Sequence, residues 1–257
     1  MDQKLFNMSG RVALVTGASS GLGTHFAQVL ADAGARVVVA ARRTERLREL
    51  VDGIEASGGQ AVAVTMDVTD AASVTRGFDE AEKAFGTVDV LINNAGVADA
   101  RLFLKTDEES WDFVIDTNLK AAWRVAHEGA ARMVKAQVPG NIVNVASMLG
   151  LGVQVGQSLY ATSKAGVVQL TKSMALELMR YQIRVNALCP GYFETEMNRD
   201  YFASEKGQAY IAKSIPSKRL GQLPELSGPL LMLASEAGSF VNGVALPVDG
   251  GHLVHSL

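Results

Sequence analysis

The chain has 257 residues, of which 48% are hydrophobic and 20% are charged, so it can bury one sizeable core. Its 24 Lys and Arg residues nearly balance its 27 Asp and Glu residues, which argues against the concentrated basic surface that nucleic acid or an anionic membrane requires. The single cysteine, Cys189, excludes an intrachain disulfide. Because the sequence also shows no secretory signal and no run long enough to cross a bilayer, we expect a cytoplasmic protein.

Short runs rich in β-branched residues alternate with longer stretches of helical periodicity. This alternation predicts right-handed βαβ units, and so an α/β fold with a mostly parallel sheet covered by helices on both faces. The predicted strands are Val12–Thr16, Arg36–Ala41, Ala61–Thr65, Val88–Ile92, Asn141–Ala146, Ile183–Leu188 and Gly243–Val248. The predicted helices are 22–33, 44–56, 70–85, 107–135, 160–180 and 224–236.

The stretch 192–222 departs from this alternation. It is polar, carries lysines and follows the sixth predicted strand. A long excursion at the carboxyl end of a strand is typical of a segment that covers an active site, so we expect a substrate lid here. The sequence shows no linker, repeat or low-complexity tract, and we therefore expect residues 1–257 to form a single domain.

The first predicted strand leads into a glycine-rich loop, TGASSGLG at 16–23, and then into a helix. A loop with few Cβ atoms lets backbone N–H groups approach a pyrophosphate, and the N-terminus of the following helix favours its negative charge. The same glycines would also serve a tight turn that needs positive φ. The position of the loop between a strand and a helix favours a dinucleotide-binding loop.

A second interpretation of this loop is the G-x-S-x-G nucleophile turn of α/β-hydrolases, with Ser19 as nucleophile. A hydrolase of that kind needs an acid and then a histidine later in the chain. His127 precedes Asp249, whereas His252 and His255 follow it by only three and six residues. This leaves little chain to place acid and base independently, so the dinucleotide loop is the preferred interpretation.

Two arginines, Arg42 and Arg43, follow the second predicted strand. An acid at this place would bind the ribose 2′-hydroxyl of NAD, whereas a cation would pair with the 2′-phosphate of NADP. A guanidinium suits phosphate because it is planar and bidentate. The arginines could instead begin a charged surface helix, but the helix dipole disfavours cations there. We therefore expect NADP(H) to be preferred, with NAD(H) possible.

The chain resembles the short-chain dehydrogenase/reductase family, in its 3-oxoacyl reductase-like branch, from Arg11 to about Gly251. The resemblance rests on an ordered set of motifs: TGASSGLG at 16–23, Asp67-Val68, NNAG at 93–96, Asn118, Ser147, YATSK at 160–164 and PGYFET at 190–195. It implies a doubly wound Rossmann domain with seven strands in the order 3-2-1-4-5-6-7, and a homotetramer.

Four residues are expected to carry the chemistry. Tyr160 would be the general acid in reduction and the general base in oxidation. Lys164 lies one helical turn further on the same face, where its charge favours the phenolate, and by the resemblance it also binds the nicotinamide ribose. Ser147 would donate a hydrogen bond to the carbonyl oxygen. Asn118, again by the resemblance, would hold a water that relays protons to Lys164.

The family's cofactor contacts are carried over from the matching motifs. The cofactor would contact Gly17, Ser19, Ser20, Gly21, Leu22, Gly23, Arg42, Arg43, Asp67, Val68, Asn94, Ala95, Gly96, Tyr160, Lys164, Pro190, Gly191, Phe193 and Thr195. Cys189 is interpreted as a buried strand-end residue, because no cationic partner for a thiolate is evident. With four histidines and no Cys/His cluster, no metal site is expected.

The expected function is an NADP(H)-dependent oxidoreductase that transfers a hydride between nicotinamide and a medium-sized ketone or secondary alcohol. An NAD-linked alcohol dehydrogenase and a non-catalytic dinucleotide sensor are the alternatives. The substrate pocket is expected to be partly apolar, with Gln154 and Gln157 as polar contacts. Its expected lining is Met148, Leu149, Leu151, Val153, Tyr192, Met197, Tyr201 and Phe202.

Overall fold

The computed structural model describes residues 3–196 and 198–255, and Met197 of the expected pocket lies outside these ranges. Within them, the core is one parallel sheet of seven strands in the order β3-β2-β1-β4-β5-β6-β7, the order and direction that the sequence predicted. The strands are β1 (Val12–Thr16), β2 (Arg36–Ala41), β3 (Gln60–Thr65), β4 (Val90–Asn93), β5 (Gly140–Val145), β6 (Ile183–Pro190) and β7 (Ala245–Val248).

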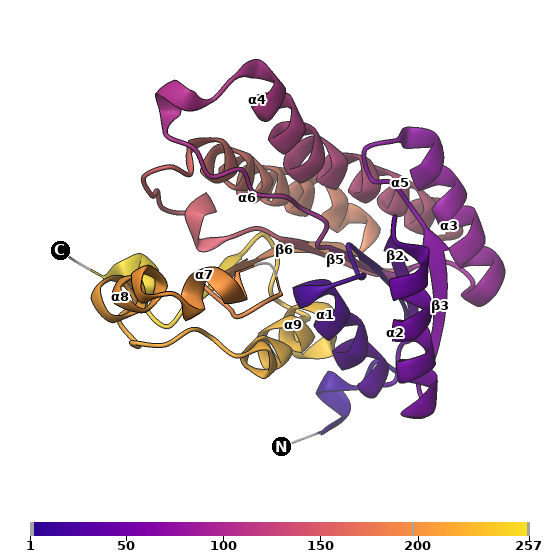
Figure 1. Cartoon of the computed structure of the whole chain (residues 1–257). Helices are drawn as coiled ribbons and strands as arrows, with labels where there is room; N and C mark the ends of the chain where they lie inside the picture. Colours follow the sequence, from indigo (N-terminus) through magenta and orange to yellow (C-terminus); the bar gives the residue numbers. More distant parts are fainter. Residues whose placement is uncertain (1–2, 197, 256–257) are drawn as a thin grey trace.

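Helices cover both faces of this sheet (Figure 1). On one face lie α1 (Gly21–Asp32), α2 (Thr44–Ala56) and α9 (Ser227–Ala234). On the other lie α3 (Ala71–Phe85), α4 (Glu108–Ile115), α5 (Ala121–Ala136) and α6 (Ser158–Leu178). Two of these helices have side-chain N-caps: Asp70 accepts hydrogen bonds from the first turn of α3, and Asp107 accepts one from α4.

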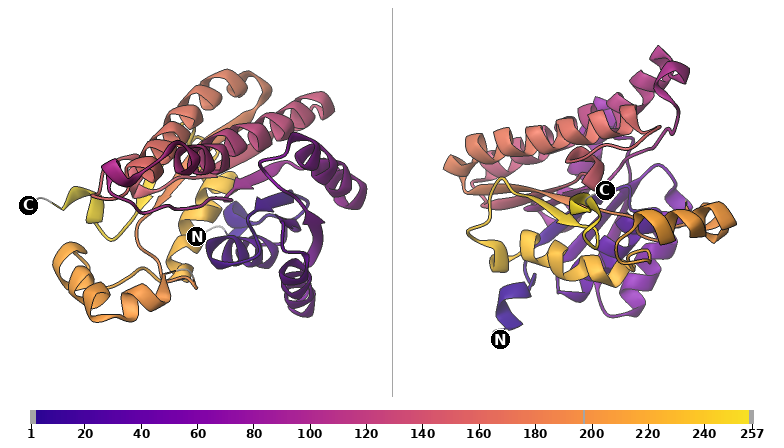
Figure 2. Two further views of the ribbon diagram at one scale, coloured as in Figure 1. Left: turned by 45° about the horizontal axis from the view of Figure 1, so that its top comes forward. Right: turned by 90° about the vertical axis from the view of Figure 1, so that its left-hand side faces the viewer.

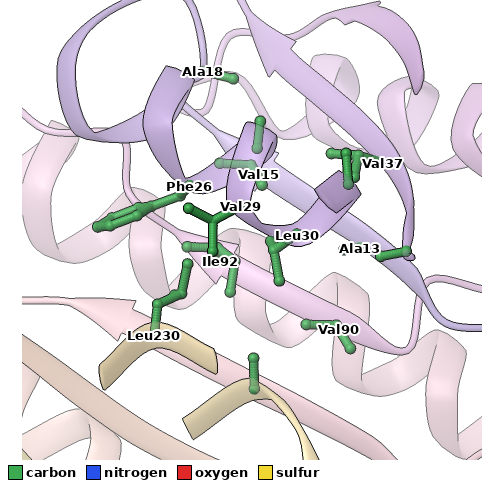
Figure 3. Close-up of a cluster of buried hydrophobic side chains, with 14 of the residues drawn as sticks. Ala13, Val15, Ala18, Phe26, Val29, Leu30, Val37, Val90, Ile92 and Leu230 are labelled. Carbon is green, nitrogen blue, oxygen red and sulfur yellow. The ribbon is translucent and has the colours of Figure 1, made fainter. Parts of the chain in front are cut away.

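Alternate side chains of the strands enter different cores. Ala13 and Val15 of β1 pack with α1 residues such as Phe26 and Leu30, as Figure 3 shows. The neighbouring β1 residues Val12 and Leu14 point to the opposite face. Every residue of β1 is buried, which explains why this strand reads as an uninterrupted apolar run rather than an alternating one.

The predicted helix 107–135 differs from the structure because it is interrupted. A π-helical turn, Asp116–Lys120, separates α4 from α5 and places the backbone N–H of Ala121 against the carbonyl of Asp116. Such turns insert an extra residue into a helix and are frequent at functional sites. The predicted helix 224–236 is also divided, into a 3-10 turn at Leu223–Leu226 and α9.

The excursion 192–222 forms a loop whose two ends are joined. The N–H of Gly221 donates to the carbonyl of Tyr192 at 2.8 Å, and Phe193 and Gly221 form an isolated parallel bridge. A Cβ at Gly221 would lie 2.4 Å from the Phe193 ring, so this position requires glycine. Between these ends lie α7 (Arg199–Ala203) and α8 (Glu205–Ser214), which project beside the sheet (Figure 2).

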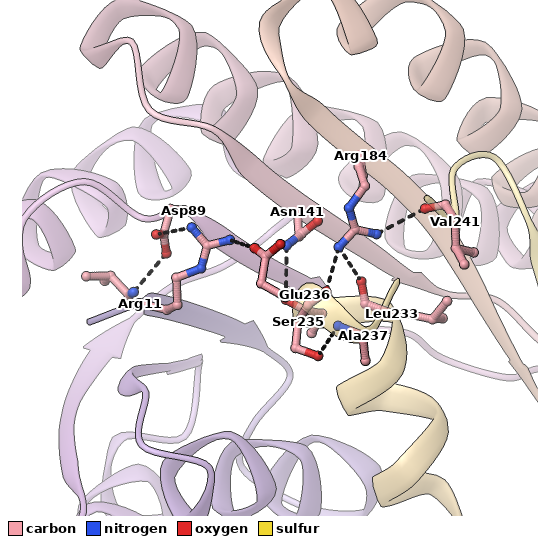
Figure 4. Close-up of polar contacts among 11 residues, drawn as sticks. Arg11, Asp89, Asn141, Arg184, Leu233, Ser235, Glu236, Ala237 and Val241 are labelled. Atoms are coloured by element: carbon pink, nitrogen blue, oxygen red, sulfur yellow. Dashed lines mark hydrogen bonds and ion pairs between the residues drawn. The ribbon is translucent and has the colours of Figure 1, made fainter. Parts of the chain in front are cut away.

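The amino edge of the sheet is closed by a polar network (Figure 4). The Arg184 guanidinium donates to the carbonyls of Leu233, Ser235 and Val241 at 3.0–3.2 Å. Two of these carbonyls belong to the C-terminal end of α9 and its cap, which have no further helical donors. Beside this network, Arg11 pairs with Asp89 at 3.1 Å. Arg184 is 8% exposed, so its guanidinium serves to hold these backbone segments together and is not available to solvent.

No helix in the described ranges is both long and apolar enough to span a membrane.

Candidate active site

A cavity of about 880 Å³ opens at the carboxyl edge of the sheet. The loops after β1 to β6 contribute to its lining, together with the excursion 192–222. Of the expected catalytic and cofactor residues, Gly23 and Asn118 are absent from the cavity lining, and the others line it. Of the expected substrate-pocket residues, Leu151 and Val153 do not line the cavity and are exposed to solvent instead. The structure therefore brings together residues from six different strand ends, as a doubly wound sheet does.

The glycine loop after β1 is packed tightly against the loop after β4. Gly17 has φ +65°, and a Cβ there would lie 2.8 Å from Cα of Ala95. A Cβ at Gly23 would lie 2.3 Å from the carbonyl oxygen of Gly17. The Asn94 amide donates to the carbonyls of Thr16 and Gly17. Gly23 is thus needed for packing within the loop rather than for contact with the cavity.

The N-terminus of α1 differs from those of α3 and α4. In the described part of the chain, the N-cap residue Ser20 makes no capping hydrogen bond with its side chain, whereas Asp70 and Asp107 cap their helices. Gly21 and Leu22 of the first turn line the cavity. First-turn N–H groups and the positive end of the helix dipole are the features that bind phosphate, so the loop fits the pyrophosphate of a dinucleotide.

Two guanidinium groups stand at the end of β2 where a 2′-phosphate is expected. Arg43 donates to the Ser19 hydroxyl at 2.9 Å and to the Ser20 hydroxyl at 2.8 Å, while Arg42 is exposed. On the adjacent strand end, hydrogen bonds from Thr69 and the charge of Arg42 lower the pKa of Asp67. The two guanidiniums at this end of the cavity suit an adenosine phosphate.

The bond from Arg43 also bears on the hydrolase interpretation. The Ser19 hydroxyl, which would be the nucleophile, accepts hydrogen bonds from Nε and Nη2 of Arg43. His25, which is the histidine nearest to Ser19 in the sequence, has its Nε2 atom 3.0 Å from the Ser227 hydroxyl instead. Ser19 is therefore placed as part of the glycine loop and not beside a histidine base within the described contacts.

Tyr160 and Lys164 lie one turn apart at the start of α6, with the lysine buried. The Lys164 Nζ donates to the carbonyl of Val145 at 2.8 Å and lies 5.7 Å from the centre of the Tyr160 ring. Burial lowers the pKa of Lys164 to about 8. Burial also raises the pKa of Tyr160, although the nearby Ser147 hydroxyl opposes this. Desolvation has the largest influence on the pKa of Tyr160, and its direction is opposite to the lowering by Lys164 that the sequence suggested.

Ser147 stands at the end of β5 and is 7% exposed. Its Oγ accepts from the N–H of Leu149 at 3.1 Å, which caps the short helical turn at Met148–Gly150. This bond uses the oxygen as an acceptor and leaves the hydroxyl hydrogen able to donate. The capping role fixes the position of a hydroxyl that lines the cavity beside Tyr160.

Asn118 lies in the π-helical turn and is buried. Its Oδ1 accepts from the N–H of Val97 at 2.8 Å, and its Nδ2 donates to the carbonyl of Val97 and to the Ser163 hydroxyl. Both hydrogens of the amide are thus used within the protein. A Cβ at Gly96 would lie 3.2 Å from Asn118 Oδ1 and 3.4 Å from Lys164 Nζ. Asn118 therefore holds the loop after β4 beside the lysine.

The loop after β6 continues the cavity wall. A Cβ at Gly191 would lie 2.7 Å from Cβ of Asp249, and the buried Phe193 packs its ring against Gly221. The expected cofactor residues Pro190, Gly191, Phe193 and Thr195 all line the cavity. Cys189 is fully buried, and burial raises the pKa of its thiol to about 11, consistent with the interpretation as a strand-end residue.

Thr16 and Tyr210 are among the residues of the site that were not expected from sequence. Thr16 was quoted only as part of a motif, yet its hydroxyl accepts from the N–H groups of Asn94 and Ala95 and so joins the two cofactor loops. Tyr210 of α8 lines the cavity but lies far along the excursion. The presence of two large apolar residues, Tyr210 and Ile211, in an otherwise polar helix was the available signal. Across residues 3–196 and 198–255, no group of three or more metal-ligating side chains is present.

Comparisons with known proteins agree with this geometry. The chain is 40% identical to gluconate 5-dehydrogenase of Gluconobacter oxydans, with 96% of each protein covered. It is 37% identical to 3-oxoacyl-acyl-carrier-protein reductase of Thermotoga maritima, with 96% of this chain and 99% of the relative covered. The structure matches a gluconate 5-dehydrogenase from Burkholderia cenocepacia, solved with NADP and tartrate, with a TM-score of 0.94, 35% identity and 100% of both chains covered.

A family model completes the comparison. The model of the short chain dehydrogenases matches residues 11–206, which include the glycine loop, the loops after β4 and β5, and the start of α6. The chain belongs to the short-chain dehydrogenase family.

Proposed function

We propose that this protein reduces a ketone, or oxidises the corresponding secondary alcohol, with NADP(H) as the hydride carrier. The observation that carries the proposal is the convergence of Ser147, Tyr160 and Lys164 in one cavity with the uncapped N-terminus of α1. A dinucleotide site and a proton-transfer site thus share one cavity, which is the arrangement that hydride transfer to a carbonyl needs.

One feature of the chain and one relative support NADP over NAD. Arg42 and Arg43 line the cavity at the end of β2, where no acid follows the strand. The first turn of α1 offers N–H donors to the pyrophosphate, which NAD and NADP share. Among the relatives, the Burkholderia cenocepacia gluconate 5-dehydrogenase was solved with NADP. When bound, the cofactor supplies or accepts the hydride, and the chain's own residues handle the proton.

The residues of the cavity are suited to the proton step. In reduction, the Ser147 hydroxyl donates a hydrogen bond to the carbonyl oxygen, where negative charge develops. Tyr160 donates its proton to the same oxygen, and its raised pKa keeps the phenol protonated at neutral pH. Lys164, whose pKa is about 8, is mostly an ammonium at pH 7. Its charge stabilises the tyrosinate that remains after the transfer.

Asn118 is proposed to act in two ways. The contacts with Val97 and Ser163 support a positioning role, because they hold the loop after β4 against α6. The water relay to Lys164 stays a prediction from the family resemblance. Since both amide hydrogens are already used, such a water would have to be bound through other atoms of the turn.

The test is a panel of ketones and secondary alcohols with both cofactors, followed through the absorbance of the reduced nicotinamide. We expect ketone-dependent oxidation of NADPH that exceeds the rate with NADH and that is lost in Tyr160→Phe. An NAD-linked dehydrogenase would show the opposite cofactor preference. A non-catalytic sensor would bind NADPH tightly without turnover of any compound in the panel, and that result would overturn the proposal.

We also propose that the protein is a homotetramer. Several large apolar side chains of the helices that cover one face are exposed, including Trp111 of α4, Trp123 of α5 and Leu176 of α6. Exposed apolar patches of this kind mark contacts between proteins. Light scattering of the purified protein measures the assembly, and a monomer would contradict the proposal.

A further inference from the structure

One wall of the cavity faces Ser147 and Tyr160 with neutral groups, and we call it the substrate wall: Met148, Leu149, Gln154, Tyr192 and Tyr210. The Tyr192 hydroxyl donates to Oε1 of Gln154. The rings of Tyr192 and Tyr210 meet edge to face with their centres 5.6 Å apart. All five side chains line the cavity.

The substrate wall is held in place from two sides. Tyr192 packs with Met148 and Leu149 on the side of Tyr160. It also packs with Phe202, Ile211 and Tyr210 on the side of the excursion. Because a rigid aromatic ring joins the two groups, its hydroxyl and the Gln154 amide have fixed positions. The wall can therefore offer oriented hydrogen bonds to a polar but uncharged substituent.

The charged residues of the cavity lie elsewhere. Arg42, Arg43 and Asp67 stand at the ends of β2 and β3, on the adenosine side. Lys164 is buried beneath Tyr160 and donates to a backbone carbonyl. Glu196 is negative and lies 3.8 Å from Arg46 of α2. Among the described residues that line the cavity, these five are the only charged ones, and the substrate wall contains none of them.

The nearest arginine after β4 is also unsuited to binding an anion. Arg101 does not contribute to the described cavity lining. Its guanidinium pairs with Asp99 at 2.9 Å and with Asp107 at 3.4 Å, so two carboxylates already neutralise it. The pKa of Tyr210 is raised by burial and by its contact with Tyr192, so the Tyr210 phenol stays neutral in mildly alkaline solution as well.

We propose that the substrate wall selects uncharged ketones and secondary alcohols and rejects substrates that carry a carboxylate. A carboxylate that replaced its water shell with this wall would find hydrogen-bond donors but no cation, and an unpaired buried charge is strongly disfavoured. This inference rests on the proposed function and narrows its substrate class. Gluconate, after which two of the similar proteins are named, is an anion and lies outside the proposed substrate class.

The test compares matched pairs of 3-oxo esters and the corresponding 3-oxo acids at saturating NADPH, over several chain lengths. We expect kcat/KM for each ester to exceed that for its acid at least tenfold. Equal values, or a preference for the acids, would overturn the inference while leaving the proposed function intact. If no ester or acid is turned over although NADPH binds, the proposed function fails and this inference fails with it.

Two variants locate the selectivity in the wall. Gln154→Arg introduces a cation beside Tyr192 and should raise the acid-to-ester ratio of kcat/KM at least tenfold. The matched variant Gln154→Leu removes the amide without adding charge and should leave acids disfavoured. An unchanged ratio in Gln154→Arg, with the melting temperature and the NADPH dissociation constant preserved, would contradict the role of the wall.

A third variant tests the arginine outside the cavity. Arg101→Ala should leave the ester-to-acid ratio unchanged within twofold, because its charge is already paired. A selective loss of acid turnover in this variant would show that Arg101 serves as an anion site, and the inference would be wrong.

Discussion

The two edges of the sheet use polar groups in opposite ways. At the amino edge, Arg184 and Asp89 are buried. Arg184 donates to three backbone carbonyls, and Asp89 accepts from the N–H of Val12 and pairs with Arg11. At the carboxyl edge, the first turn of α1 has no side-chain cap within the described residues, and the Tyr160 hydroxyl lines an 880 Å³ cavity. Groups that are paired inside the chain stabilise it, and groups that are left for a ligand do the chemistry.

Burial shifts pKa values at both edges, but with different consequences. It lowers the pKa of Arg184 and raises that of Asp89. Both groups nevertheless keep their hydrogen-bond partners within the protein. The same desolvation lowers the pKa of Lys164 to about 8, which places the loss of its charge within reach of ordinary solution conditions. The carboxyl edge is therefore the edge whose charge state can change during function.

The largest difference should come from Tyr160→Phe. Removal of the hydroxyl eliminates the proton donor, and general acid catalysis is worth about 10²–10⁴-fold in rate. We expect kcat to fall by that amount, while the free energy of unfolding measured in urea changes by less than about 1 kcal/mol, because the ring remains packed. Strong destabilisation of this variant would break the distinction between the two edges.

Arg184→Met should have the complementary effect at the amino edge. It leaves three carbonyls without their donor, and unsatisfied buried acceptors cost about 1–3 kcal/mol each before relaxation. We expect the free energy of unfolding to fall by about 3 kcal/mol, with kcat per folded molecule unchanged. The exposed Arg48→Met is the matched control. If the free energy of unfolding falls equally in both variants, the hydrogen bonds of Arg184 do not stabilise the fold.

Arg42→Asp sharpens the role of the charged end of the cavity. The change opposes a 2′-phosphate and offers an acceptor to a 2′-hydroxyl. We expect the preference for NADPH over NADH, measured as the ratio of kcat/KM values, to fall about 10–100-fold. Arg48→Asp makes the same change of charge on the exposed part of α2 and should leave the ratio unaltered. An undiminished NADPH preference in Arg42→Asp would contradict the assignment.

The smallest effect is the pH dependence of the wild-type enzyme. Because the pKa of Lys164 is lowered from 10.5 to about 8, its ammonium is present below that pH and is lost above it. We expect kcat/KM for ketone reduction to be level near neutrality and to decline above about pH 8, approaching tenfold per pH unit. A profile that stays level to pH 10 would show that the lysine charge does not assist the tyrosine.

The fold could be predicted from sequence because its signals are repeated and local. The strands are apolar runs in the sequence and most helices are amphipathic stretches, so the seven strands appear close to the predicted places. The π-helical turn at Asp116–Lys120 was not predicted, because one inserted residue hardly changes the periodicity of a long helix. The last strand begins at Ala245 rather than at Gly243, where φ is +77°.

The site shows a different limit of sequence reasoning. Motif spacing selected residues that mostly line one cavity, but it could not separate these from residues outside the lining, such as Gly23 and Asn118. Nor could it give the pKa of Tyr160, because burial depends on residues distant in sequence. Tyr210 was missed because the return path of the excursion 192–222 depends on tertiary packing.

The closed ends of that excursion have an evolutionary consequence. Since Tyr192, Phe193 and Gly221 fasten its two ends together, residues between them can be lengthened, shortened or exchanged without altering the course of β6 or the entry into α9. Part of the cavity lining is thereby carried on a segment that can be exchanged, while Ser147, Tyr160 and Lys164 lie at the end of β5 and on α6. New substrates can then be acquired by replacing a single continuous segment of the gene.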